Sequence, residues 1–383
     1  MEISHFCFAL DSTKGGVPSS ILLSAVELTK HGINSRIFSA GNTKNQISKN
    51  LPHLANLAKT GVDFEYSLAR IENSYGIGSL RGLNRAITGS SKSDLIVLHQ
   101  IYTFSTLLGY GFAKRYHIPF AVQPHGSLTH YHESDSKLIK VIAKKLMISK
   151  ILREAVAIIV TCKSERDDLD ISLQPKTWNL HYGAIITEQS GQVDLPIVNA
   201  RGNDRIMFSG RFDKKKNLPL LLKAMPEIVE RYPNLILDIA GSGSAKEIRY
   251  LKSLIESLSL AKNIEFHGWI NKTEMKALFS STRLLVLPSE NENFALVVSE
   301  ALSAGVPCVV SKFVGTADIV AKHHAGEVIA ELTPNSVAAG VIKVLEGDEN
   351  AYRDAAIAAT REDLDWSKIA LKWKDLISSL AVE

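Results

Sequence analysis

The chain has 383 residues, of which 45% are hydrophobic and 22% are charged, and its formal net charge is +4. This length exceeds what one hydrophobic core usually serves, so we expect two domains. The composition is that of an ordinary soluble globular protein, and the sequence contains no run of 18 apolar residues, which excludes a membrane-spanning helix.

The first residues, MEISHFCFALD, alternate like a strand and lack the basic segment of a signal peptide. We therefore expect a cytoplasmic protein. Cys7, Cys162 and Cys308 are widely spaced, and each lies in or beside an apolar strand-like run. This pattern predicts free, buried thiols rather than disulfides or metal ligands.

Strand-like and helical segments alternate along the whole chain, which predicts an α/β protein with two doubly wound parallel sheets. Residues 42–80 show no clear pattern. The predicted strands of the first half are 3–9, 33–39, 94–99, 119–123 and 156–161, and the predicted helices lie near 17–31, 104–116 and 135–153.

The second half begins after a polar stretch with Gly and Pro, residues 189–204, which is the best linker candidate. Its predicted strands are 205–209, 235–240, 263–267, 283–287, 307–310 and 326–329. The predicted helices lie near 217–230, 245–258, 271–280, 294–304, 334–346, 351–361 and 366–380. We place an N-terminal domain at 1–190, a linker at 191–204, a C-terminal domain at 205–364 and a final helix at 365–383.

Residues 137–153 (KLIKVIAKKLMISKILR) carry six cations and no acid. On a helix, Lys137, Lys140 and Lys144 share a face, and apolar residues cover much of the remaining circumference. Such a helix suits an anionic membrane surface. A core helix with snorkelling lysines is the equal alternative. Salt-sensitive binding to anionic liposomes, lost when the three lysines become Glu, would distinguish them.

The first predicted strand is followed by the segment Asp-Ser-Thr-Lys-Gly-Gly-Val-Pro and then by a helix. The backbone N–H groups of Gly15 and Gly16 can face a phosphate at the helix N-terminus. The spacing fits neither the dinucleotide-binding pattern nor the P-loop. A plain tight turn is the alternative.

His125 follows a predicted strand, between Pro124 and Gly126, where open α/β sheets bind ligands. His99 also ends a strand and ranks second; a loop histidine that caps a helix is the alternative. His125, His130 and His132 lie close in sequence, but their loop offers neither a fixed ligand geometry nor a nearby cysteine cluster. We therefore expect no metal site.

Arg211 follows the first strand of the second half, and Lys216 lies near the start of the next helix. A guanidinium fork and a compact ammonium can converge on one diphosphate and stabilise it as it leaves. A cluster of surface cations is the alternative. Further along, Gly241 and Gly243 would let a turn approach a nucleotide.

Residues 288–301 (PSENENFALVVSEA) follow a predicted buried strand and open a helix, for which Asn293 is a plausible N-cap. Glu292 would lie just before the helix and Glu300 on its second turn, roughly 10 Å apart along the axis. This is about the span from the ribose to the sugar of a nucleotide diphosphate sugar, with the helix N-terminus between them for the phosphates. An acidic loop followed by a surface Glu is the alternative.

This stretch resembles the signature of glycosyltransferase family 4, P-S-x-x-E-G-F-G-L-V-x-x-E-A, with Asn293 and Ala295 in place of two glycines. Gly210-Arg211 with Lys216 is similar to the family's G-R-x-x-x-x-K pattern, with Asn217 where the family usually has Gly. The Gly15-Gly16 loop resembles its GGV-type loop. Pro124-His125-Gly126 resembles a motif of family members that build bacterial surface polysaccharides.

The resemblance implies a GT-B fold, in which two Rossmann-like domains face a cleft and the last helix crosses back to the first domain. It also implies roles for individual residues. Glu292 would contact the donor sugar, Glu300 would bind the ribose hydroxyls, and His125 would face the transferred sugar. Arg211, Lys216 and the Gly15-Gly16 loop would stabilise the departing phosphates. The remaining donor-binding candidates are Gly241, Gly243, His267, Asn293, Phe294, Ala295 and Leu296.

The resemblance further implies a retaining, metal-independent enzyme without a protein nucleophile or cofactor. We expect it to move a hexose from a UDP- or GDP-sugar to a polyprenyl-diphosphate-linked or saccharide acceptor, in O-antigen, capsule or exopolysaccharide synthesis. We expect a peripheral location on the inner face of the plasma membrane and no nucleic-acid partner. The rivals are a sugar-nucleotide 2-epimerase of the same fold and a catalytically silent binding partner of another transferase.

Overall fold

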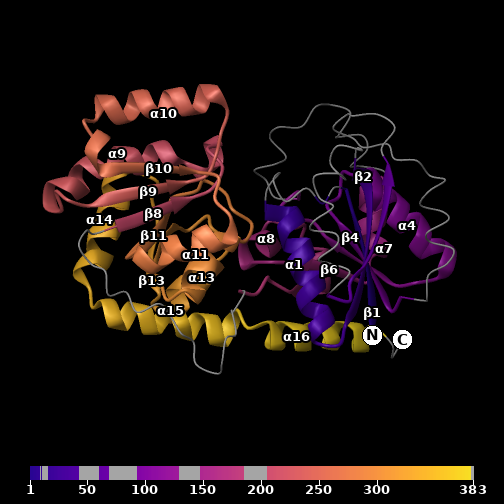
Figure 1. The fold of residues 1–383 in the computed structure, drawn as a ribbon. Helices are drawn as coiled ribbons and strands as arrows, with labels where there is room; N and C mark the ends of the chain where they lie inside the picture. Colours follow the sequence, from indigo (N-terminus) through magenta and orange to yellow (C-terminus); the bar gives the residue numbers. More distant parts are fainter. Residues whose placement is uncertain are drawn as a thin grey trace. The chain divides into compact units, whose positions relative to one another are not determined.

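The computed structural model describes residues 1–8, 10, 16–42, 60–68, 93–128, 147–184 and 205–380. The chain divides into two compact units (Figure 1): Met1–Tyr182 together with Trp366–Glu383, and Gly183–Asp365. The predicted linker 191–204, Gly15, and residues 137–146 of the basic segment lie outside the described residues. Among the described helices, none is both long and apolar enough to cross a bilayer.

The first unit contains a parallel sheet with the strand order β3-β2-β1-β4-β5-β6-β7. The chain therefore leaves β1 toward one edge and returns to β4 on its other side, which defines a topological switch point between these two strands. The strands are β1 (Glu2–Cys7), β2 (Asn34–Asn42), β3 (Asp63–Leu68), β4 (Leu95–His99), β5 (Phe120–Gln123), β6 (Ala157–Val160) and β7 (Thr177–Asn179).

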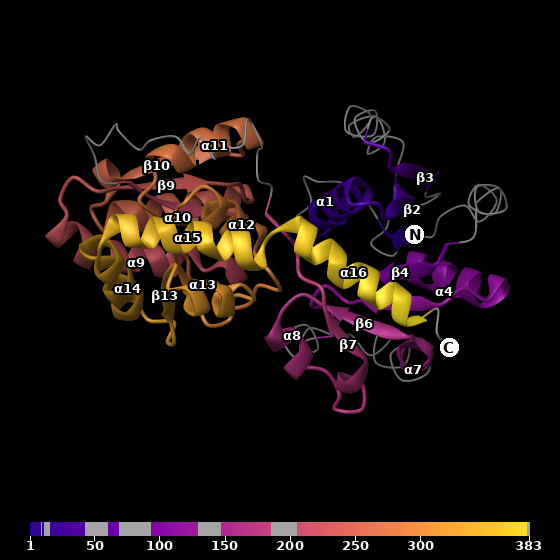
Figure 2. The same ribbon diagram turned by 90° about the horizontal axis from the view of Figure 1, so that it is seen from below.

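All five strands predicted for this half are present, together with β3 from the unassigned stretch and the short β7. The described helices of the unit are α1 (Gly16–Lys30), α4 (Phe104–Tyr116), α7 (Ser149–Glu154), α8 (Lys163–Asp167) and α16 (Trp366–Leu380). Of the basic segment, the structure describes residues 147–153, which include the start of helix α7 at Ser149. Helix α16 packs against α1 (Figure 2).

Alternation along β1 sends neighbouring side chains to opposite faces of the sheet. Phe6 stacks on Phe38 with ring centroids 4.8 Å apart, in one buried cluster, whereas Cys7 joins Ile21 and Ala25 of α1 in another. The sheet is thus covered on both faces, as a parallel sheet requires. All three cysteines are buried and free, as predicted.

The second unit contains a parallel sheet with the order β10-β9-β8-β11-β12-β13, so that its switch point lies between β8 and β11. The strands are β8 (Arg205–Ser209), β9 (Ile236–Ala240), β10 (Ile264–Gly268), β11 (Leu284–Leu287), β12 (Cys308–Ser311) and β13 (Gly326–Ile329). The helices are α9 (Leu218–Arg231), α10 (Ala245–Ser257), α11 (Lys272–Ser281), α12 (Leu296–Ser303), α13 (Ala317–His323), α14 (Pro334–Glu346) and α15 (Glu349–Asp363).

These elements confirm the two predicted parallel-sheet α/β domains. The strand β11 is wholly buried, and buried residues of α9 and α14 pack against one another beside the sheet. Most predicted boundaries in this unit agree to within two residues, and helix α13 was not predicted. The unit presents the loops that follow β8 and β11 at adjoining strand ends.

Candidate functional site

The candidate site in the second unit lies at the switch point, where the loops after β8 and β11 adjoin. Lys216 from the first loop and Glu292 from the second form an ion pair, with Nζ 2.9 Å from Oε1. The side chains are only 13% and 12% exposed. The structure therefore brings together two residues that the sequence predicted separately.

Local structure fixes the position of Lys216. It ends a short 3-10 helix, Lys214–Lys216, whose N-cap Asp213 accepts a hydrogen bond from the Lys216 backbone N–H at 3.2 Å. A Cβ placed on Gly210 would lie 3.1 Å from Cε of Lys216. The lysine stem thus runs over the Gly210 backbone. Asn217 closes the turn with φ 56°, a left-handed conformation that Asn tolerates.

The backbone of Glu292 is held by a segment that the sequence analysis did not identify. Its N–H donates to Phe313 O at 3.0 Å, and its carbonyl accepts from Gly315 N–H at 2.8 Å. Two residues earlier, the Glu290 N–H donates to Lys215 O at 2.7 Å and ties together the loops that carry the ion pair. These backbone contacts hold the Glu292 main chain in place, and its carboxylate pairs with Lys216.

The expectation that Asn293 caps the helix is wrong. Helix α12 begins at Leu296, and its N-cap is Ala295, which makes no side-chain capping bond and has φ 64° and ψ 75°. The left-handed residue is therefore the alanine that stands at the second glycine position of the family pattern. Phe294 and Ala295 are buried, so these two can offer a ligand mainly backbone groups.

Glu300 lies on the second turn of α12, as expected. Burial raises its pKa above the usual value for a glutamate, and the nearby charge of Lys272 opposes this shift. A partly buried carboxylate on this face can accept hydrogen bonds from hydroxyl groups. The structure does not bring it into the Lys216–Glu292 pair.

Arg211 points to different partners from Lys216. Its guanidinium lies 3.2 Å from Asp213 Oδ2, its side chain is 55% exposed, and its charge contributes to lowering the pKa of Glu247 after the hydrogen bonds from Ser244. The Asp213 carboxylate therefore contacts both predicted residues: it accepts from the Lys216 backbone N–H and pairs with the Arg211 guanidinium.

Gly241 and Gly243 are required by packing. A Cβ on Gly241 would lie 1.8 Å from Gly210 O, and one on Gly243 would lie 2.8 Å from Cβ of Phe212. The Phe212 N–H also donates to Ser242 O at 2.9 Å. The two glycines thus allow the turn after β9 to pack directly on the loop that carries Arg211 and Lys216.

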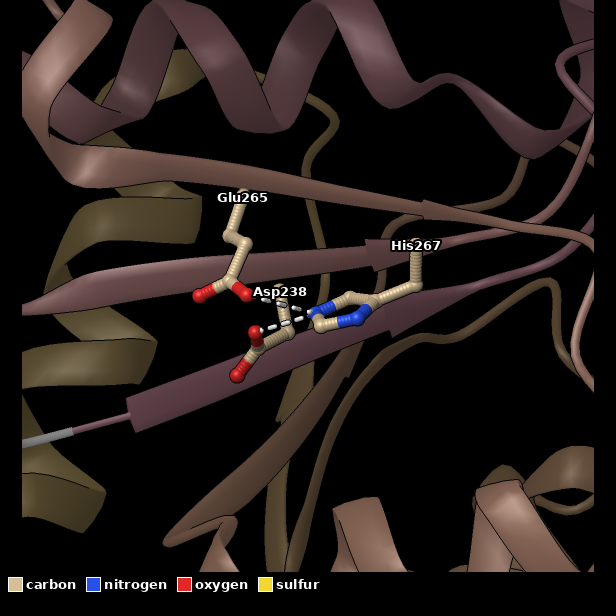
Figure 3. A group of neighbouring side chains, drawn as sticks. All are labelled: Asp238, Glu265 and His267. Atoms are coloured by element: carbon tan, nitrogen blue, oxygen red, sulfur yellow. Dashed lines mark hydrogen bonds and ion pairs between the residues drawn. The ribbon is translucent and has the colours of Figure 1, made fainter.

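His267 belongs to a charged network on neighbouring strands (Figure 3). Its Nε2 lies 2.6 Å from Oδ1 of the fully buried Asp238 and 4.0 Å from Oε1 of Glu265. These three side chains form a group of potential metal ligands within the part of the chain that the structure describes. The side chain of His267 is therefore engaged with β9, and its backbone neighbour Gly268 accepts from Gly241 N–H at 2.7 Å.

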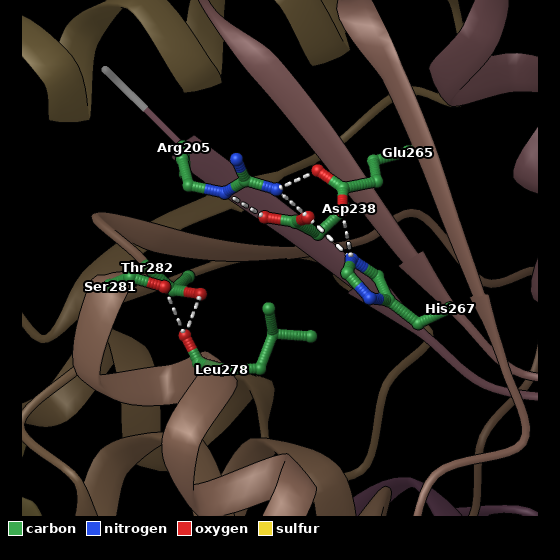
Figure 4. Close-up of polar contacts among 7 residues, drawn as sticks. All are labelled: Arg205, Asp238, Glu265, His267, Leu278, Ser281 and Thr282. Carbon is green, nitrogen blue, oxygen red and sulfur yellow. Dashed lines mark hydrogen bonds and ion pairs between the residues drawn. The ribbon is translucent and has the colours of Figure 1, made fainter. Parts of the chain in front are cut away.

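Arg205 binds both acids of this group (Figure 4). Its Nε donates to Asp238 Oδ2 at 2.8 Å, its terminal nitrogen donates to Asp238 Oδ1, and the same nitrogen lies 2.5 Å from Glu265 Oε2. A guanidinium thus neutralises the carboxylates that a metal ion would need. The chemistry of this group is that of a structural ion network, which the sequence did not predict.

In the first unit, the predicted residues also lie at strand ends beside the switch point. Gly16 begins α1, and His125 follows β5 in a left-handed turn, with φ 53° at His125 and 75° at Gly126. Buried Glu165 holds this turn, because its carboxylate accepts from Gly126 N–H at 2.6 Å and from Thr161 N–H at 2.9 Å. No sequence pattern had pointed to Glu165.

Both ring nitrogens of His125 have protein partners. Nδ1 lies 2.9 Å from the Tyr182 hydroxyl and Nε2 lies 2.8 Å from Nδ1 of His99. His125 is 9% exposed, and burial lowers its pKa to about 3, so the ring is neutral at pH 7. The two histidines that the sequence ranked first and second are thus in direct contact.

Comparison with known proteins identifies a family domain within the second unit. Residues 196–363 match the family model for glycosyl transferases group 1. An uncharacterized glycosyltransferase of Methanocaldococcus jannaschii, MJ1607, is 34% identical over 169 residues, which span 43% of this chain and 42% of that protein. The D-inositol 3-phosphate glycosyltransferase of Corynebacterium glutamicum is 24% identical over 370 residues, 88% of this chain and 85% of that protein.

Among solved structures, Anabaena HepE in complex with UDP-glucose superposes with a TM-score of 0.74 at 16% identity, covering 99% of this chain and 100% of HepE. The fold is GT-B, as in similar glycosyltransferase structures. Residues 196–363 form a glycosyl transferases group 1 domain. With its glycosyltransferase relatives, this domain identifies the chain as a transferase enzyme of the glycosyltransferase type.

Proposed function

We propose that the protein is a retaining glycosyltransferase that moves a hexose from a nucleotide diphosphate sugar to a lipid-linked or saccharide acceptor. The observation that carries the proposal is the Lys216–Glu292 ion pair at the switch point of a glycosyl transferases group 1 domain. An ammonium and a carboxylate held side by side can bind the diphosphate and the sugar of a nucleotide-sugar donor. The cation attracts the phosphates, and the carboxylate accepts from sugar hydroxyls.

In this proposal, Arg211 and Lys216 stabilise the diphosphate as it leaves, in place of a metal ion. Both are within reach of Asp213, which gives their loop one fixed conformation. The uncapped start of α12 adds N–H groups toward the phosphates. Glu300 accepts from the ribose hydroxyls. The acceptor attacks the face that the nucleotide leaves, so no protein nucleophile is required.

The donor and pathway are the finer parts of the proposal. HepE was solved with UDP-glucose, which supports UDP-sugars as the first donors to test, with GDP-sugars next. The Pro124-His125-Gly126 motif supports a role in cell-surface polysaccharide synthesis, such as O-antigen, capsule or exopolysaccharide. A peripheral position on the inner face of the plasma membrane follows from a polyprenyl-diphosphate-linked acceptor.

The test is release of nucleoside diphosphate from a panel of UDP-, GDP- and ADP-sugars, with EDTA present and with or without an extract of polyprenyl-linked acceptors. Acceptor-dependent release from one donor supports the proposal, and an axial-to-axial or equatorial-to-equatorial product linkage establishes retention. Conversion of the donor sugar without acceptor would instead identify a 2-epimerase. A folded protein that binds no donor and releases no diphosphate would overturn the proposal in favour of a silent partner.

A further inference from the structure

A continuous row of polar side chains crosses the core of the first unit. His5 Nδ1 lies 2.9 Å from His99 Nε2, His99 Nδ1 lies 2.8 Å from His125 Nε2, and His125 Nδ1 lies 2.9 Å from the Tyr182 hydroxyl. The histidine rings are stacked, with centroids 5.2 and 5.1 Å apart. All four side chains are less than 10% exposed. We call these four residues the histidine chain.

The histidine chain ends beside helix α1. Burial raises the pKa of the Tyr182 phenol, and nearby Ser20, whose hydroxyl donates to Val17 O at 2.8 Å, opposes this shift. Ser20 and Val17 lie in the first turns of α1, which begins at Gly16. The row therefore runs from the His125 turn to the neighbourhood of the start of α1, the two segments of this unit that carry predicted site residues.

The hydrogen bonds of the chain can run in either of two directions. In one of them the Tyr182 oxygen, which already accepts from Gln123 Nε2 at 3.2 Å, also accepts from His125 Nδ1–H. His125 then carries its proton on Nδ1 and accepts at Nε2 from His99 Nδ1–H. His99 accepts in turn at Nε2 from His5 Nδ1–H.

The His5 end distinguishes the two directions. Within the described part of the chain, His5 Nε2 is buried and has no hydrogen-bond partner. In the direction just described, this atom is an unpaired acceptor, whereas in the opposite direction it would be an unpaired N–H. A buried orphan N–H is the rarer case in proteins. The His5 end therefore favours a proton on Nδ1 of all three histidines.

We propose that His5, His99 and Tyr182 are positioning residues, which hold His125 in a single tautomer beside the start of α1. The proposal deepens the proposed function, since it rests on His125 and the start of α1 lying at the transfer site. Burial keeps the rings neutral, because it lowers the pKa of His5 to about 4 and that of His99 well below its usual value. A chain of neutral rings can reverse only if every member changes its tautomer.

The tautomers can be measured directly on the full-length protein labelled with ¹⁵N-histidine, by long-range ¹H–¹⁵N correlation at pH 7. Single histidine substitutions assign the signals. We expect His5, His99 and His125 each to show a protonated Nδ1 and a bare Nε2. A proton on Nε2 of His125, or a charged His125 ring, would overturn the proposal. The tautomers themselves are read on the wild-type protein, and the measurement needs no enzymatic activity.

Tyr182→Phe tests the coupling. Without the phenol oxygen, one end of the chain or the other must hold an orphan N–H, so the two directions become similar in energy. We expect mixed tautomers at all three rings, including His5. The matched control is Tyr110→Phe, which removes a hydroxyl bonded to Glu154 in the same unit and leaves the three rings unchanged. If Tyr182→Phe changed the tautomer of His125 and left those of His99 and His5 unchanged, the three rings would not be coupled and the proposal would be contradicted.

Transfer kinetics give a second readout. A positioning role predicts that Tyr182→Phe lowers kcat about tenfold and leaves the donor KM within about twofold, the scale of one misplaced buried hydrogen bond. Equal kcat in Tyr182→Phe and wild type would refute the positioning role. If no donor is turned over at all, the proposed function fails, whereas the tautomer measurement still decides whether the chain exists as described.

Discussion

The two switch points place polar groups at the same topological position but use them differently. In the first unit, three histidines in or after β1, β4 and β5 are buried, neutral and hydrogen-bonded to one another. In the second unit, between β8 and β11, Lys216 and Glu292 carry opposite charges and keep some exposure. A row of neutral, hydrogen-bonded side chains can fix the position of a ring at little desolvation cost. A partly exposed pair of opposite charges can instead interact with a charged ligand.

This contrast predicts that substitutions at the site of the second unit mainly reduce activity. Substitutions in the histidine chain of the first unit should mainly reduce stability. The largest expected effect is that of Glu292→Gln, which keeps the shape of the side chain and removes its charge. We expect transfer to fall roughly 1,000-fold, because a fixed carboxylate is lost where charge develops. The measurement is kcat/KM for the donor, and Glu290→Gln, two residues earlier, is the control. Transfer by Glu292→Gln at the wild-type rate would remove Glu292 from the site.

In the first unit, His99→Leu removes the middle of the histidine chain. We expect the free energy of unfolding to fall by about 2–4 kcal/mol, since buried nitrogens of His5 and His125 each lose a partner. Urea denaturation followed by circular dichroism measures this loss. His31→Leu, in a partly exposed turn, should cost less than about 0.5 kcal/mol. Equal losses in the two variants would show that the chain contributes nothing to stability.

The pH dependence of stability separates the two units further. The pKa values of His5 and His125 are lowered to about 4 and about 3, so the unfolded state binds protons first as pH falls below 6.5. Stability is therefore complete above pH 6.5 and declines toward pH 4, by about 1.4 kcal/mol per pH unit for each histidine. Glu300 has the opposite sign, because its raised pKa lets the folded state take up its proton first.

The check is the slope of unfolding free energy between pH 6.5 and 5. We expect it to be smaller in His99→Leu than in wild type by at least the contribution of one histidine. His117→Asn, at an exposed left-handed position, is the control and should keep the wild-type slope. An unchanged slope in His99→Leu would mean that the buried rings do not stay neutral.

The smallest expected effect concerns Ala295, whose φ of 64° is unfavourable for any residue with a Cβ. Ala295→Gly relieves this strain but adds freedom to the unfolded chain, so we expect a net gain of about 0.5 kcal/mol. Ala304→Gly, at a right-handed helix end, should instead be neutral or destabilising. A loss of stability in Ala295→Gly would show that the alanine methyl group packs usefully.

The sequence predicted most of the fold because hydrophobic strands and amphipathic helices are local patterns. It failed for β7, α8 and α13, which have three to seven residues and carry too little periodic signal. It also misplaced the start of α12, because Asn293 is a good capping residue whereas the structure uses a left-handed alanine. Capping preferences of residue types do not reveal that an alanine will adopt a left-handed conformation that glycine usually takes.

The candidate site was predicted as a set of residues but not as contacts. Lys216 and Glu292 were identified from motifs, and the contact between them follows from the sheet order. The histidine chain could not be predicted, because its members are separated by 94, 26 and 57 positions in sequence. Glu165 was missed for the same reason: its partner Gly126 lies 39 positions away.

The central claim is that the paired cation of the second unit acts on the donor. Lys216 and Lys214 lie two positions apart in one lysine run, and only Lys216 contacts Glu292. The most direct measurement is therefore acceptor-dependent release of nucleoside diphosphate by Lys216→Ala and Lys214→Ala, side by side with wild type. We predict that Lys216→Ala loses transfer and Lys214→Ala retains it; equal activity in the two variants would contradict the account.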